Sequence, residues 1–192
     1  SPRSRNERVC PQGAEGETRK KSTIHLLDPL QPLENHILAA ILRQPDIVYR
    51  LDRMLQQNNL DRLKDADFSS TQNQHLFVLI QESLSQDELD PVVYIQDHKP
   101  IGIESYSEEA QRFSMDSVIK FDDMLSDCFR TILRMRQITI HQSLQEMKYL
   151  QEDGEENETD EAIQYQRRVH LFTQELRKIT LAMGTLTRLK TS

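Results

Sequence analysis

Tryptophan is absent from this chain, and glycine and cysteine are scarce, with five and two copies among 192 residues. Few glycines leave few natural turns, so the composition suits helices better than a turn-rich β-structure. Cys10 and Cys128 lie far apart and form no metal-spaced pair, which indicates free thiols in a reducing, cytosolic setting. No apolar run approaches the ~20 residues that span a bilayer, and no signal-peptide core stands at the start. We therefore expect no disulfide and no membrane segment.

Sequence signatures of catalysis are also missing. The chain contains no G-x-x-x-x-G-K-[S/T] phosphate loop and no C-x-x-C or H-x-x-x-H pair that presents metal ligands. Asp65-Ala66-Asp67 is a lone Asp-x-Asp, which can hold a divalent cation but is better explained as a polar corner and cap before Phe68. We predict a non-enzymatic fragment, with no catalytic residues, no metal and no cofactor.

The charge is acidic on average, with a formal net charge of −7, which argues against a general nucleic-acid binder. Residues 1–28 depart from this average, because they hold six bases and four acids among few apolar side chains. Such a segment cannot bury enough apolar area to offset its ordering entropy, so we predict a flexible linker. A nucleic-acid-binding arm is the alternative. For the fragment as a whole we expect weak or no direct nucleic-acid binding.

A compact helical bundle is predicted over residues 29–130. Apolar residues at 3-to-4-residue spacing predict a first helix that starts near Leu33. Pro45 disfavours helical geometry at Gln44 and suits the first turn of the next helix. We therefore expect a tight helix–proline–helix corner, with the second helix over residues 47–57.

Two further helices are predicted in the bundle. Ser69 or Ser70 can cap a third helix with an apolar face. The segment after Pro91, residues 92–95, has the composition of a strand. Because no partner strand is evident nearby, we predict a short helix there.

Two long helical patterns fill residues 116–190, with a very acidic break between them at 152–161. The second pattern alternates 3- and 4-residue steps, which is the seam of a packed helix pair. Its members are Ala162, Tyr165, Val169, Phe172, Leu176, Ile179, Met183 and Leu186. The first pattern carries Cys128 on its own seam, as a small buried hydrophobe rather than a nucleophile. We predict an all-α fold: a compact helical bundle followed by a long helix and a C-terminal antiparallel helical hairpin, with the hairpin subdomain over 131–192.

The final arm, residues 162–192, is basic and holds six bases against one acid. The helix dipole explains part of this pattern, and a solvated face with ordinary exposed leucines is the simple alternative for the rest. Bases and leucines nevertheless share one helical face opposite the seam, which favours a partner surface. The predicted partner-binding residues are Arg167, Leu171, Gln174, Lys178, Leu181, Thr185 and Arg188.

Three stretches of this sequence resemble the C-terminal, helicase-binding domain of bacterial DNA primase. They are the Leu33–Asp46 run around Pro45, the Asp67-Phe68-Ser69 and Asn73-Gln74-His75-Leu76-Phe77 element, and Asp90-Pro91-Val92-Val93. With the charged helical pair at 116–190, the resemblance covers about residues 30–190. The lengthened corner at 58–66 and the loop at 98–115 depart from the family pattern.

The resemblance implies a non-catalytic interaction module whose parent protein is a DNA-directed, primer-synthesising RNA polymerase, the primase. In this family the zinc-binding and polymerase domains lie upstream, and the module docks on the N-terminal collar of the replicative hexameric helicase. The hairpin is the usual principal contact. The implied location is the bacterial cytoplasm, at the nucleoid-associated replisome. The implied state is a monomer, with a hairpin-mediated dimer as the alternative.

The N-terminal domain of the replicative helicase itself shares this fold and much of the same sequence, so it is the alternative identity. In that case the fragment is a structural, oligomerisation element. The absence of a motor domain after the hairpin and the tether-like segment before the bundle favour primase.

Overall fold

The computed structural model describes residues 28–98, 120–153 and 159–189. All regular elements within these ranges are helical, so the predicted all-α fold is confirmed for the described part of the chain. In chain order they are α1 (Gln31–Arg43), α2 (Ile47–Gln57), the 3₁₀ turn η1 (Asp65–Asp67), α3 (Thr71–Ser85), α4 (Pro91–His98), α6 (Phe121–Asp153) and α7 (Thr159–Leu189). The predicted linker and the loop at 98–115 lie outside these ranges except for Asp28 and His98, and so does the middle of the acidic break, residues 154–158.

Pro45 separates α1 from α2 as predicted. Gln44, the residue before it, leaves the helical region with φ −145° and ψ 86°, because the proline ring disfavours helical geometry there. The α1 face that carries Ile37, Leu38 and Ile41 is fully buried. The corner places both helices against α6, which contacts α1 and α2.

Local caps start α3 and α4. The Ser70 hydroxyl accepts a hydrogen bond from the Asn73 amide at 3.1 Å, which satisfies an orphan donor in the first turn of α3. The Asp90 carboxylate does the same for the Val92 amide at 2.9 Å, and α4 starts at Pro91. The predicted short helix is therefore confirmed, and its capping outweighs its strand-like composition.

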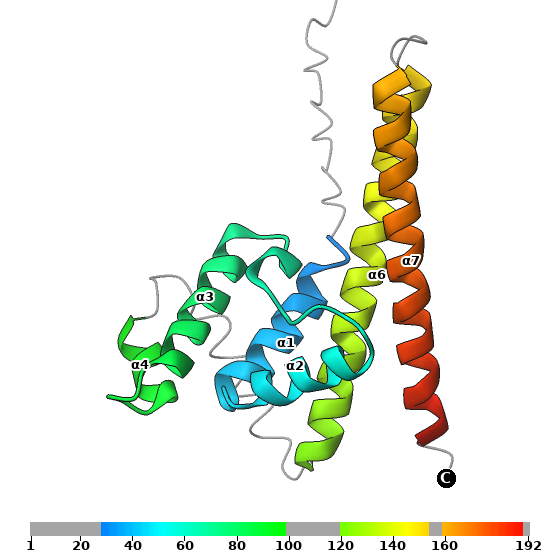
Figure 1. The fold of residues 1–192 in the computed structure, drawn as a ribbon. Helices are drawn as coiled ribbons and strands as arrows, with labels where there is room; N and C mark the ends of the chain where they lie inside the picture. The colour runs from blue at the N-terminus through cyan, green and yellow to red at the C-terminus, as the bar shows by residue number, and fades with distance from the viewer. Residues whose placement is uncertain (1–27, 99–119, 154–158, 190–192) are drawn as a thin grey trace, which may run out of the picture.

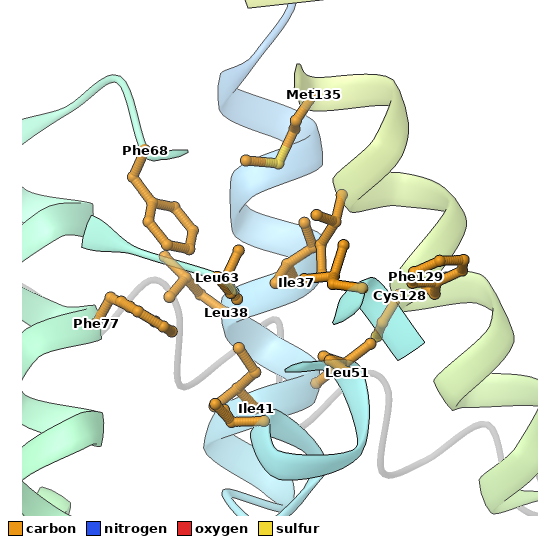
Figure 2. Packing of buried hydrophobic residues seen from close by; sticks show 14 of the residues in the cluster. Ile37, Leu38, Ile41, Leu51, Leu63, Phe68, Phe77, Cys128, Phe129 and Met135 are labelled. Atoms are coloured by element: carbon orange, nitrogen blue, oxygen red, sulfur yellow. The ribbon is translucent and has the colours of Figure 1, made fainter. Parts of the chain in front are cut away.

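One apolar cluster joins the described bundle helices, α1 to α4, with both helices of the hairpin. α1 runs through its middle, with Phe68 and Phe77 on one side and Cys128 on the other (Figure 2). α6 packs on α1, α2 and α7, and α7 adds the buried Ile179 and Ala182 (Figure 1). The predicted boundary between bundle and hairpin, after residue 130, thus falls inside one unbroken helix and one shared cluster.

A buried arginine ties α6 to the corner between α2 and α3. Arg136 is 9% exposed, and its guanidinium donates to both oxygens of the Asp67 carboxylate, at 2.8 and 2.7 Å. Its two terminal nitrogens also donate to the backbone carbonyls of Asp61 and Arg62, each at 2.8 Å. Each guanidinium nitrogen therefore has a partner, which is the condition under which a buried charge is tolerated.

A second buried polar side chain ties α1 to the start of α3. Glu34 in α1 is fully buried, and its carboxylate accepts hydrogen bonds from the Ser69 amide at 2.6 Å and the Asn73 side chain at 2.5 Å. Arg136 and Glu34 therefore hold the segment between α2 and α3 at two points. This segment contains the lengthened corner at 58–66.

Replacing Arg136 with alanine is expected to lower the free energy of unfolding by about 3–5 kcal/mol, because the Asp67 carboxylate, only 16% exposed, loses its ion pair and the carbonyls of Asp61 and Arg62 lose their donors. Denaturant unfolding followed by circular dichroism measures this loss. Lys178→Ala is the control: it breaks a more exposed ion pair with Glu175, of 3.1 Å. Its expected effect is about 0.5 kcal/mol or less. Equal losses in the two variants would contradict a structural role for the buried arginine.

Cys128 is completely buried, as predicted, and burial raises the pKa of its thiol from the ordinary 9.0 to about 12. Between these two pH values the unfolded chain loses the thiol proton while the folded chain keeps it, so stability falls as the pH rises. The slope from one such group is about 1.4 kcal/mol per pH unit. Cys128→Ala removes this titration. Its free energy of unfolding, measured by denaturant titration, is therefore expected to fall less steeply from pH 9 to pH 12 than that of the native chain. Curves of equal slope would show that the folded thiol ionises normally.

Candidate partner-binding surface

α7 lies antiparallel to α6 along one edge of the molecule, and its inner face packs on α6 (Figure 1). The predicted seam faces inward: Ile179 is fully buried, and Val169, Phe172 and Leu176 are half-buried. Burial decreases toward the start of α7, where Ala162 is exposed. The opposite face of α7 is turned toward solvent.

All predicted partner-binding residues whose side chains are described lie on this solvent face and are exposed. They are Arg167, Leu171, Gln174, Lys178, Leu181 and Thr185. Leu171 is 56% exposed and Leu181 is 64% exposed, although both side chains are apolar. Arg188 lies in the last turn of α7, and its side chain is outside the described residues.

One exposed residue extends this face beyond the prediction. Ile163 is 53% exposed and precedes Arg167 by four residues, so it lies on the same side of the helix. The sequence contains the signal for this residue, because the 3-to-4-residue spacing of the predicted face reaches Ile163 when it is continued by one turn toward the start of the helix. We define the α7 stripe as Ile163, Arg167, Leu171, Gln174, Lys178, Leu181 and Thr185.

The α7 stripe is basic on an acidic chain. Between Ala162 and Thr185 the helix holds four bases and one acid, whereas the whole chain has a net charge of −7. The helix dipole favours bases only in the last turn, and Arg167 and Arg168 lie in the first third of α7. The helix dipole therefore does not explain these two arginines, and of the two only Arg167 lies on the α7 stripe.

Groups of metal-binding side chains are absent from the described residues: no three His, Cys, Asp or Glu side chains come together there. His36 of α1 lies 2.8 Å from the Asp127 carboxylate of α6, and His75 is exposed on α3. None of the helices in these ranges is long and apolar enough to cross a membrane. Among the described residues, the row of exposed apolar and basic side chains on α7 is the candidate site.

Comparison with models of protein families, with curated proteins and with solved structures finds no match for this chain. A function therefore has to be inferred from the fold, from the α7 stripe and from the resemblance in the sequence.

Leu181→Glu is expected to change the free energy of unfolding by less than about 0.5 kcal/mol, because most of this side chain is already in water. Ile179→Ala, two residues earlier and fully buried, is expected to lower it by about 2–5 kcal/mol. Urea unfolding of both variants beside the native chain measures the difference. A large loss in Leu181→Glu would show that this leucine is packed against the protein.

Proposed function

We propose that this chain is the helicase-binding module of a bacterial DNA primase, and that it docks on the N-terminal collar of the replicative hexameric helicase through the α7 stripe. The observation that carries the proposal is the stripe itself. Three large apolar side chains, each more than half exposed, share one helix face with bases on an acidic chain. Contiguous exposed apolar surface rimmed by polar residues marks protein–protein interaction sites, and in this proposal the row of apolar side chains on α7 serves as such a surface.

The fold suits a module that binds and does not catalyse. The bundle buries most of its apolar residues in one cluster, while the hairpin of α6 and α7 extends beyond it and presents α7 along one edge (Figure 1). A two-helix arm that is already folded loses little conformational entropy on binding. In this proposal the bundle anchors the arm and the α7 stripe makes the contact.

Docking of this kind gives a physical reason for the coupling of primer synthesis to unwinding. It holds the parent primase where single-stranded template emerges from the helicase, so the effective concentration of the polymerase at the template rises. No catalytic residue is needed in this fragment. The proposed setting is the bacterial cytoplasm, at the replisome. Direct nucleic-acid binding is weak or absent in this proposal, because the net charge is −7.

The alternative is the N-terminal domain of a replicative helicase, and the exposed stripe also fits a contact between subunits of such a ring. Sedimentation of the chain at micromolar concentration separates the two functions. A primase module is expected to sediment as a monomer, or at most as a hairpin-paired dimer. Formation of rings would favour the helicase domain.

Charge reversal on the stripe tests the proposal. In a pull-down with the cognate helicase, Arg167→Glu combined with Lys178→Glu is expected to weaken binding by about tenfold or more, with helicity unchanged. Arg168→Glu is the matched control, because it reverses an exposed base on the same helix that points about 100° away from the stripe. Rising salt should weaken binding only moderately, since the leucines contribute too.

The two ways in which this experiment can fail have different meanings. If the native chain binds the helicase and the double variant binds equally well, the contact lies elsewhere on the molecule. If the native chain does not bind the helicase at all, the primase function is wrong.

A further inference from the structure

The shape of the α7 stripe limits the kind of element that can cover it. Its apolar side chains, Ile163, Leu171 and Leu181, are 53%, 56% and 64% exposed. From residue 163 to residue 181 the helix rises by about 27 Å, at 1.5 Å per residue. All three lie on one side of α7. A single element that covers all of them therefore has to be straight and to follow α7 for about five turns.

A helix fits this surface better than an extended segment. α7 satisfies its own backbone hydrogen bonds, so an extended peptide lying on it finds no partner for its N–H and C=O groups. A helix arrives with its backbone satisfied and presents apolar side chains at the same 3-to-4-residue spacing. A crossing angle near 20° keeps such a helix in contact with both Leu171 and Leu181, which lie about 15 Å apart along α7. A crossing near 50° reaches only one of them.

The bases on the stripe disfavour a second copy of this chain as the covering element. Arg167 stands between Ile163 and Leu171, and Lys178 stands between Leu171 and Leu181. If two copies paired about a two-fold axis centred near residues 172–173, Arg167 of one copy would face Lys178 of the other. Parallel pairing would place each base opposite the same base of the other copy. A partner that carries carboxylates opposite Arg167 and Lys178 replaces this repulsion with two ion pairs.

We propose, on the basis of the function above, that the helicase segment covering the stripe is an acidic amphipathic helix of about five turns. It packs along α7 at a shallow angle, with its apolar residues over Leu171 and Leu181. Its carboxylates pair with Arg167 and with Lys178, whose ammonium group also lies 3.1 Å from the Glu175 carboxylate of α7.

Photo-cross-linking of the full chain to the cognate hexameric helicase tests this geometry. A photoreactive amino acid replaces Leu171 in one variant and Leu181 in another, and mass spectrometry locates the attached helicase residues. Both positions should attach to a single acidic segment, at sites about ten residues apart, because both helices rise equally per residue. Tyr49, which is 57% exposed on α2, is the matched control and should not label this segment.

A charge swap gives a second readout. After the segment is located, its acid nearest to Arg167 is changed to lysine and combined with Arg167→Glu. Each single change is expected to weaken binding severalfold, and the pair should restore most of the affinity.

Cross-links from the two stripe positions to different helicase elements, or to a basic or extended segment, would overturn this inference. The pull-down would then still support the helicase as the partner, whereas failure of the native chain to bind would remove both proposals. Dimerisation of the chain that Leu181→Glu abolishes would also overturn it. Tight binding of single-stranded DNA by the native chain, if Arg167→Glu abolished it, would overturn this inference as well.

Discussion

Arg136 occupies the point at which the bundle and the hairpin are joined. Its guanidinium meets the Asp67 carboxylate and two backbone carbonyls in a site nearly closed to water. A charge in such a site is tolerated only when it is paired and hydrogen-bonded. The helix that carries it, α6, packs on α1 and α2 and also on α7. The position of α7, and with it the α7 stripe, therefore depends on α6 being held in one place against the α2–α3 corner.

Packing and the proposed binding use different faces of α7. Ile179 and Ala182 join the shared apolar cluster, whereas Leu171 and Leu181 remain largely in water. Full burial of a leucine side chain is favourable by about 1.5–3 kcal/mol, and these two leucines gain it only when a partner covers them. The arrangement thus separates the side chains that hold the hairpin together from those available for association. In the proposed function, binding therefore uses the stripe.

Much of the fold was predictable because it depends on local signals. Pro45 ends α1, Ser70 caps α3 and Pro91 opens α4, and each acts within a few residues along the chain. The α7 stripe was predictable for the same reason, since helical spacing alone places its members on one side. The same spacing, continued by one turn toward the start of α7, also reaches Ile163.

The buried charges were not predictable. Arg136 and Asp67 are 69 residues apart, Glu34 and Asn73 are 39 apart, and charged residues on helices are usually exposed. By itself the sequence determined the helices, their ends and their apolar and basic faces, because backbone preference and the helical period act locally. Only the tertiary structure decided which charges are buried, and that α6 serves the bundle and the hairpin at once. These features depend on contacts between residues that are distant in the sequence, which no local pattern contains.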